Sequence, residues 1–336
     1  MSSSGLSVAF DRLGWLQRTG HLQRHILFLD LNFWIKLSEN RISLYQDLNK
    51  ALHEAVEEGI LICPISPSIY VELQKQNSLE KWKSYAQLMD QLSGKLSVRI
   101  SQNIFVEEFR AILTGDQISR EIAYSHYVDA SSVSGLKFPE HGWDEAMTDE
   151  GTKLIFDEIE ALPIAQSLSM TEKNRPQYMD PLGKGWRQLT EQEAKWREAN
   201  KEVPSAEIEE AEFTSTVTSV LPQIFRVYME GDDLTKLRMF STSLQEKREL
   251  VKACPTFWNK YKVIAALRSN RSKLTENDMW DLEHVVSAVP YVDCLACDGG
   301  MRHLLTQMLS LDKKYRVKIV STPDEILAWV NSLNSA

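Results

Sequence analysis

Two short apolar runs, near opposite ends of the chain, each finish on an aspartate. The first is ILFLD at residues 26–30 and the second is YVDCLACD at residues 291–298. Apolar runs of this length are typical of buried strands. A carboxylate at the end of a buried strand is costly unless it caps a helix or binds a cation. The pattern therefore predicts two buried strands whose carboxyl ends meet polar partners.

Strand-like and helix-like segments alternate around both of these runs. At the N-terminal side, Ser66 and Pro67 mark the start of a helix after a second apolar run, because serine is a good N-cap and proline suits the first helical position. Such alternation is typical of a parallel sheet with crossover helices. The predicted strands are 26–30, 60–66, 291–298 and 316–321, and the predicted helices include 41–58, 275–290 and 322–333.

The alternation is absent from the middle of the chain, where helical spacing dominates. Residues 79–125, 154–162, 190–230 and 243–268 have mainly helical patterns, and loops are expected at 129–153 and 174–186. We therefore predict an α/β fold with a parallel sheet flanked by helices and a large, mostly helical insertion between its two halves. The predicted divisions are an N-terminal segment at 1–24, a first half at 25–80, the insertion at 81–274 and a second half at 275–336.

Composition restricts the partners of the protein. The 336 residues carry a net charge of −9, which argues against attraction of the whole surface to nucleic acid or to an anionic membrane, although a local basic groove remains compatible with it. No apolar run approaches the roughly 18 residues of a membrane helix, and the N-terminus lacks a signal-peptide pattern. With four cysteines, too few for a disulfide framework, we expect a cytoplasmic protein.

Four carboxylates are expected at one edge of the sheet. Asp30 and Asp298 end strands, Glu72 lies early in the helix after the second strand, and Asp281 lies in the helix before the strand of Asp298. Clustered carboxylates repel one another, so we expect them to bind Mg²⁺ or Mn²⁺. Two such ions would activate a water and stabilise the leaving oxygen of a phosphodiester. Taken singly, each acid also fits a structural role, such as a helix cap or a solvated helix face.

Four motifs resemble those of PIN-like domains, a nuclease superfamily: ILFLDLN, ISPSIYVEL, DLEHVVSA and CLACD, within residues 25–80 and 275–333. The resemblance implies a PIN-like fold and metal-dependent cleavage of RNA, usually single-stranded. It assigns the catalytic, metal-binding acids to Asp30, Glu72, Asp281 and Asp298. Asn32 matches a frequent polar residue, whereas Cys297 stands where the family often has Thr or Ser, and the insertion departs from the family's compact form.

Several neighbours of these acids have two interpretations. Asp278 fits either a cap for the helix that begins near Thr275 or an additional metal ligand. His284 lies one turn after Asp281 and fits either the core or a position behind the metal ligands. Asn32 and Cys297 are expected in that same supporting position.

A basic stretch precedes the third acid. Residues 258–273 include the aromatic residues Trp258 and Tyr261 among several cations, a combination that suits a phosphate-tracking surface and equally a solvated helix face. Arg302, just after two glycines, is placed to reach a scissile phosphate. The predicted substrate-binding residues are Lys260, Lys262, Arg268, Arg271 and Arg302.

These features favour a metal-dependent endoribonuclease that hydrolyses phosphodiester bonds of single-stranded RNA, with DNA as the alternative substrate. The resemblance points to a bacterial toxin or a phage-defence effector, and so to a protein partner that restrains or activates it; we also expect a homo-oligomer. Two other functions fit the same residues. One is a catalytically silent PIN-like protein-binding module, and the other is a metal-dependent phosphatase.

Overall fold

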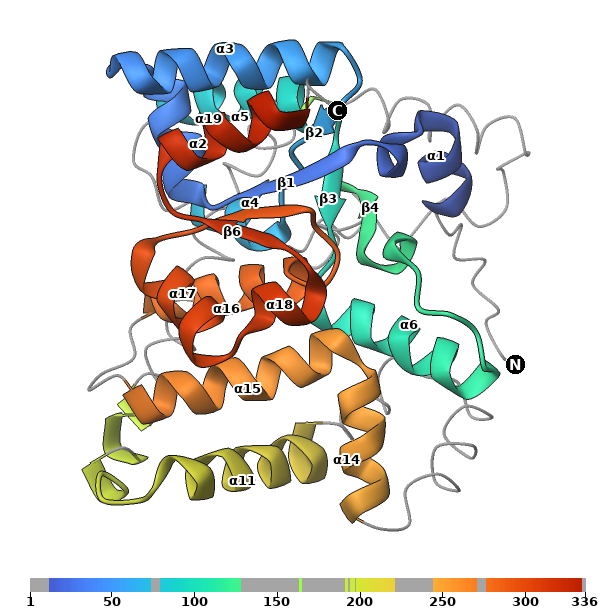
Figure 1. Cartoon of the computed structure of the whole chain (residues 1–336), viewed down its shortest axis with the longest axis vertical. Helices are drawn as coiled ribbons and strands as arrows, with labels where there is room; N and C mark the ends of the chain where they lie inside the picture. Colours follow the sequence, from blue (N-terminus) through green and yellow to red (C-terminus); the bar gives the residue numbers. More distant parts are fainter. Residues whose placement is uncertain are drawn as a thin grey trace, which may run out of the picture.

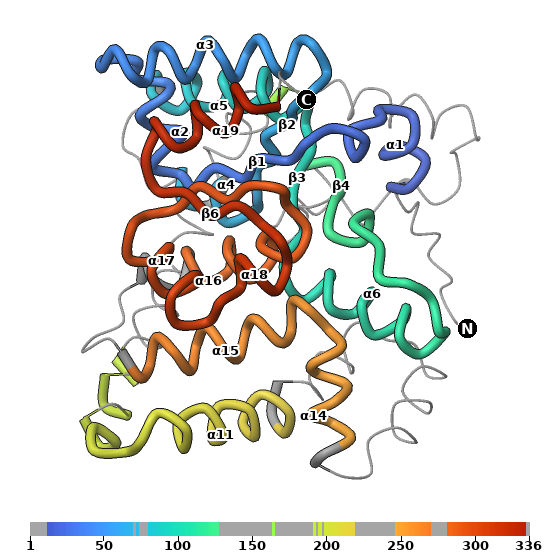
Figure 2. The backbone as a smooth tube through the Cα atoms, in the orientation of Figure 1, coloured from blue at the N-terminus to red at the C-terminus, as the bar shows by residue number. Residues whose placement is uncertain are grey.

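A computed structural model describes residues 12–73, 79–127, 163–164, 191–192, 194–196, 198–220, 244–270 and 276–333. Its central feature is a four-stranded parallel sheet in the order β2-β1-β5-β6. The strands are β1 (His25–Leu29), β2 (Leu61–Ile62), β5 (Cys294–Ala296) and β6 (Lys318–Val320). This confirms the α/β prediction, and Figure 2 shows the blue and red ends of the chain meeting in the sheet.

The strands are shorter than the apolar runs that predicted them. The second strand was expected at 60–66 but ends at Ile62, because Pro64 has no N–H for a ladder bond. After the proline, Ile65 makes an isolated parallel bridge to Ser97. The third strand was expected at 291–298 but is limited to Cys294–Ala296. Apolar character marks the run, whereas backbone pairing sets the strand length.

Helices cover both faces of the sheet (Figure 1). On one side lie α2 (Leu31–Glu39), α3 (Ser43–Glu57), α5 (Leu79–Ser93) and α19 (Pro323–Leu333), and α19 packs directly on α3. On the other lie α16 (Glu276–Ala288), α17 (Gly299–His303) and α18 (Leu311–Tyr315). The remaining helical segments near the sheet are α1 (Arg12–Thr19), η1 (His21–Gln23), α4 (Pro67–Leu73) and η5 (Leu304–Met308).

Residues from both halves of the sequence form one hydrophobic core. Leu27 and Phe28 of β1 and Leu295 of β5 are buried, as expected for a parallel sheet with both faces covered. The helical spacing predicted for residues 41–58 is also confirmed, since it buries the apolar face of α3 against this core. That face consists of Tyr45, Leu48, Leu52 and Ala55.

The described part of the middle region is mainly helical. It contains α6 (Ser101–Thr114), α11 (Ser205–Ser215), the π-helical η4 (Thr216–Val220), α14 (Leu244–Ala253) and α15 (Pro255–Asn270). A second hydrophobic cluster joins these helices, built on Phe105, Phe109, Phe213, Phe257 and Tyr261. The helix predicted at 243–268 is in fact two helices, because Pro255 can begin a helix but cannot continue one.

A small second sheet in this region was not predicted. β3 (Leu96–Val98) pairs antiparallel with β4 (Tyr124–His126), which follows the turn η2 (Arg120–Ala123). Strands of three residues are too short for an alternating pattern to reveal them.

The loops predicted at 129–153 and 174–186 and the helix predicted at 154–162 lie outside the described residues. None of the described helices has the length and apolar character needed to cross a bilayer.

Candidate active site

Two acids follow neighbouring strands of the sheet. In the ladder between β1 and β5, Leu29 pairs with Ala296, and the Asp30 backbone N–H donates to the Ala296 carbonyl at 3.0 Å. Asp298 comes two residues after Ala296. The pairing therefore brings Asp30 and Asp298 to the same carboxyl edge, where ligands of parallel sheets gather.

Both of these acids are helix N-caps. The Asp30 Oδ1 atom accepts the Leu31 N–H at 2.7 Å at the start of α2. The Asp298 Oδ1 atom accepts the N–H groups of Gly300 at 2.6 Å and Met301 at 3.0 Å at the start of α17. The capping role that the sequence left open is therefore present. Each side chain still has acceptor positions left for another partner, because an ionised carboxylate offers about four of them.

A small pocket lies between these caps and α16. Asp30, Asp281, His284 and Asp298 provide its polar lining, and its volume is about 10 Å³, roughly the room that one water or one ion needs. Asp30 is buried, Asp281 is half-buried, and Asp298 is exposed, so the pocket opens to solvent on the Asp298 side. The rest of the lining is Phe28, Val285, Leu295, Ala296, Cys297 and Met301.

His284 connects the fourth acid to this pocket. Its Nε2 atom lies 3.2 Å from the Glu72 Oε2 atom, and its Nδ1 atom lies 2.8 Å from the Ser66 hydroxyl. Burial lowers the pKa of His284, but the hydrogen bond and charge of Glu72, together with Asp30 and Asp281, outweigh burial and raise it. A protonated His284 donates from both nitrogens. The raised pKa favours this protonated form, which places positive charge among the acids.

The carboxylates raise one another's pKa. The pKa of Asp281 is raised to about 7. Burial is the largest cause, followed by the charge of Asp30, and the charges of Glu72 and Asp298 add to it. Burial also raises the pKa of Asp30, against the opposing effects of His284 and the Leu31 N–H. The site thus favours an added proton or cation at neutral pH.

This coupling predicts a pH dependence for the metal-free protein. The folded-state pKa of Asp281, about 7, lies above its ordinary value, so the folded protein binds the proton more tightly than the unfolded chain. Stability should therefore fall as the pH rises from about 4 to about 7 and then level off. Melting temperatures in EDTA should show this slope in the parent and a flatter one in Asp281→Asn.

A matched control uses an exposed acid on α3. Asp47→Asn should leave the slope unchanged, because Asp47 lies on the solvent side of that helix. Equal slopes in the parent and in Asp281→Asn would contradict the coupling among the acids.

The residues expected to support the acids lie close to them. The Asn32 Nδ2 atom donates to the Asp30 Oδ2 atom at 3.3 Å. Asn32 therefore orients the Asp30 carboxylate and is not itself placed as a ligand. Cys297 is buried in the pocket lining, and burial raises the pKa of its thiol, as do the charges of Asp298 and Asp30. The backbone of Asp278 lies in α16, but its side chain lies outside the described residues.

The cations of α15 have carboxylate partners. The Lys260 ammonium donates to the Ser101 hydroxyl at 3.1 Å and lies 3.7 Å from Glu283, which itself caps α6 through the Ser101 N–H at 2.8 Å. Lys262 donates to Glu209 of α11 at 2.5 Å. These contacts favour structural roles for both lysines, and their contact with RNA stays a prediction.

The remaining predicted substrate contacts are placed in a similar way. Arg268 forms an ion pair with the buried Glu212, and its guanidinium lies over the ring of Trp196. Arg302 donates to Glu325 of α19 at 2.7 and 2.8 Å. It also donates to the hydroxyl of Ser321, just before α19, at 3.1 Å. Arg271 lies outside the described residues.

The aromatic part of the α15 prediction needs a correction. Tyr261 has only 1% of its surface exposed, so it is a core residue and is not available to stack on a base. Trp258 is half-buried, and the ammonium groups of Lys262 and Lys314 lie 5.2 Å and 4.6 Å from its ring. The helical pattern of 258–273 did not distinguish the face toward the second hydrophobic cluster from the face toward solvent.

These ion pairs predict that one α15 cation contributes mainly to stability. Removing Arg268 leaves the buried Glu212 carboxylate without its partner, which should cost about 2–3 kcal/mol of unfolding free energy. Urea unfolding of Arg268→Ala measures this cost. Lys252→Ala removes an exposed pair with Glu249 and should cost less than about 1 kcal/mol. Equal, small costs would show that the buried pair has no special weight.

The acids suit a hard cation in their chemistry. Asp30, Asp281 and Asp298 offer oxygen ligands around a pocket large enough for one ion, and Mg²⁺ and Mn²⁺ prefer such oxygens. Across the described residues, however, no three His, Cys, Asp or Glu side chains are grouped closely enough to hold one ion as they stand. Among the described side chains, ion binding would need the carboxylates to lie closer together, which their mutual repulsion opposes.

One contributor to the site was not predicted from the sequence. Ser66 was expected only as an N-cap, and it does accept the Ile69 N–H at 3.3 Å, but its hydroxyl also positions the His284 ring. The Ser-Pro pair signalled the cap, whereas the contact with a histidine 218 residues away depends on the fold.

Comparisons with known proteins add no family assignment: no family model, no curated protein and no solved structure matches this chain.

Proposed function

We propose that this protein is a metal-dependent nuclease of PIN-like type that hydrolyses phosphodiester bonds in RNA. The observation that carries the proposal is the group of acids at the carboxyl edge of the sheet. Asp30, Asp281 and Asp298 line one pocket, and Glu72 reaches it through His284. A site that raises the pKa of Asp281 to about 7 favours cations at neutral pH.

Within this proposal the four acids would hold Mg²⁺ or Mn²⁺, which supplies an activated water and a counter-charge for the phosphate. Other groups of the protein orient and hold the residues of the site. Glu72 and Ser66 orient the His284 ring, and the charge of Glu72 and its hydrogen bond favour the protonated form. Burial and the neighbouring charges raise the pKa of Asp281 to about 7 in the metal-free protein, and a bound cation would favour its ionised form. The caps on α2 and α17 fix Asp30 and Asp298.

Incubation with labelled RNA and DNA, in Mg²⁺, Mn²⁺ or EDTA, tests the proposal. We expect RNA to be cleaved with either metal and to stay intact in EDTA. Cleavage of DNA alone would change the substrate class, and cleavage that persists in EDTA would contradict the role of the acids. Comparing cleavage of single-stranded and double-stranded RNA of the same sequence shows which of the two forms is the substrate.

A silent binding module is the second candidate. The observation that favours it is that Lys260, Lys262 and Arg268 are engaged by carboxylates, which leaves less positive charge for a phosphate backbone. A salt titration of RNA binding by the triple alanine variant tests the predicted contact, because loss of phosphate contacts flattens the slope. An unchanged slope removes these three residues from the substrate-binding set.

A further inference from the structure

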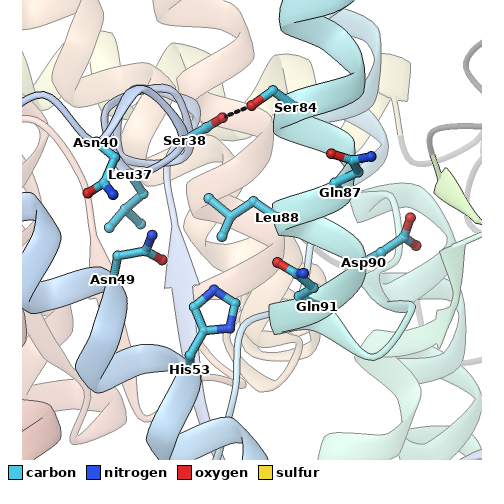
Figure 3. A pocket seen from close by; sticks show the side chains of 10 residues that line it. All are labelled: Leu37, Ser38, Asn40, Asn49, His53, Ser84, Gln87, Leu88, Asp90 and Gln91. Carbon is cyan, nitrogen blue, oxygen red and sulfur yellow. Dashed lines mark hydrogen bonds between the residues drawn. The ribbon is translucent and has the colours of Figure 1, made fainter.

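A second, larger cavity lies away from the acids, between the C-terminal end of α2 and the helices α3 and α5. Its volume is about 590 Å³, within the range of small-molecule sites. Figure 3 shows Asn49 and His53 of α3 facing Leu88 and Gln91 of α5 across it. The other lining residues are Leu37, Ser38, Asn40, Ser84, Gln87 and Asp90.

Most of this lining is polar but uncharged. Amide, hydroxyl and imidazole groups surround two leucines, Leu37 and Leu88, and no Lys or Arg is among the described lining residues. The one carboxylate, Asp90, accepts the Ile164 N–H at 3.0 and 2.9 Å. With no cation to bind it, a phosphate or carboxylate group on a ligand would be unfavourable here.

The amides that line this cavity can both donate and accept hydrogen bonds. Within the described residues, the Asn49 Oδ1 atom is buried and has no donor. α2 ends beside this cavity at Asn40, whose left-handed backbone donates to the Lys36 carbonyl and whose own carbonyl accepts from Gln46 at 3.1 Å. The Ser38 and Ser84 hydroxyls bond to each other at 2.6 Å and close one end of the cavity (Figure 3).

We propose that this cavity binds a small, non-anionic molecule with several hydrogen-bonding groups, such as a nucleoside or a sugar. The amides of Asn49, Gln91 and Asn40 can both donate to and accept from such a ligand. Leu37 and Leu88 contact the apolar face of the ligand.

This site is separate from the acids. α2 begins at the Asp30 cap and ends at Asn40, and its nine residues span about 13 Å. A ligand at the far end of α2 is therefore not the group on which the acids act. Binding at the cavity stands or falls independently of nuclease activity.

Calorimetric titration of the full chain in EDTA tests the proposal with two neutral probes and their phosphorylated counterparts. The pairs are adenosine with adenosine 5′-monophosphate, and glucose with glucose 6-phosphate. We expect saturable binding of at least one neutral probe, and at least about tenfold weaker binding of its phosphorylated partner, because no Lys or Arg is among the described lining residues. Which neutral probe binds distinguishes a nucleoside from a sugar.

Asn49→Leu should weaken the binding about tenfold, the usual effect of one lost hydrogen bond. Gln91→Leu provides a second variant in case the first does not fold, and Asn103→Leu, a half-buried asparagine on α6, is the matched control that should bind normally. No binding of either neutral probe, tighter binding of the phosphorylated ones, or full affinity in both cavity variants would overturn the proposal.

Discussion

Replacing Asp30 with Asn should reduce RNA cleavage by at least about 100-fold, more than the loss of an outer-shell partner at a metal site typically causes. Asn keeps the size of the side chain and one acceptor oxygen, but it removes the charge that attracts the ion. The helix should remain intact, because Asn is as good an N-cap as Asp and can still accept the Leu31 N–H.

The effect on stability should have the opposite sign. Asp30 lies in the field of Glu72 and Asp281, so removing its charge relieves repulsion in the metal-free protein. We expect Asp30→Asn to melt no lower than the parent in EDTA, and to gain less from added Mg²⁺, because a ligand stabilises only in proportion to its binding. Melting curves with and without Mg²⁺ measure both effects.

Asp293 offers a matched control at the other end of the same strands. Its Oδ2 atom accepts the Ile26 N–H at 2.8 Å and its Oδ1 atom accepts from Arg120 at 2.8 Å, so its role is structural. Asp293→Asn should lower stability and leave cleavage unchanged. If Asp30→Asn instead melts lower and cleaves normally, Asp30 is a cap and nothing more.

The largest loss of stability is expected at Glu108. This carboxylate of α6 is fully buried and accepts the Thr256 N–H at 2.9 and 3.2 Å, which caps α15, and the Tyr291 hydroxyl at 2.5 Å. Glu108→Ala leaves both donors buried without an acceptor and creates a cavity. We expect a loss of about 3–5 kcal/mol in unfolding free energy, measured by urea denaturation.

Two variants make this prediction specific. Glu107→Ala removes the neighbouring acid, which pairs with Arg99 and Arg110 closer to the surface, and should cost about 1 kcal/mol or less. Glu108→Gln keeps an acceptor and should lose less than alanine. Burial raises the pKa of Glu108, so the parent should lose stability as the pH rises above about 4.5, and the glutamine variant should lack this contribution. A Glu108→Ala protein with the parental urea midpoint would contradict the role of this network.

The pattern of the sequence predicted the sheet because its signals are local. Apolar runs that end on Asp30 and Asp298, and the Ser66-Pro67 helix start, need only neighbouring residues to be recognised. The same local signals placed the acids at strand ends, where a parallel sheet brings them to one edge. The three-residue strands β3 and β4 were missed, because three residues carry no measurable period.

Only the tertiary structure decided the partners of each side chain. Sequence spacing placed Lys260, Lys262 and Arg268 on a basic helix. It did not reveal the acids of α11 and α16 that pair with them, because those acids come from distant segments. It also could not show that Ser66 and Glu72 hold His284, or that Asp281 titrates near pH 7. The sequence by itself thus determined the four strands of the parallel sheet and the two acids that follow them, Asp30 and Asp298. Hydrogen bonding, burial and charge coupling depend on distances between segments far apart in the chain, and the packing of the helices set those distances.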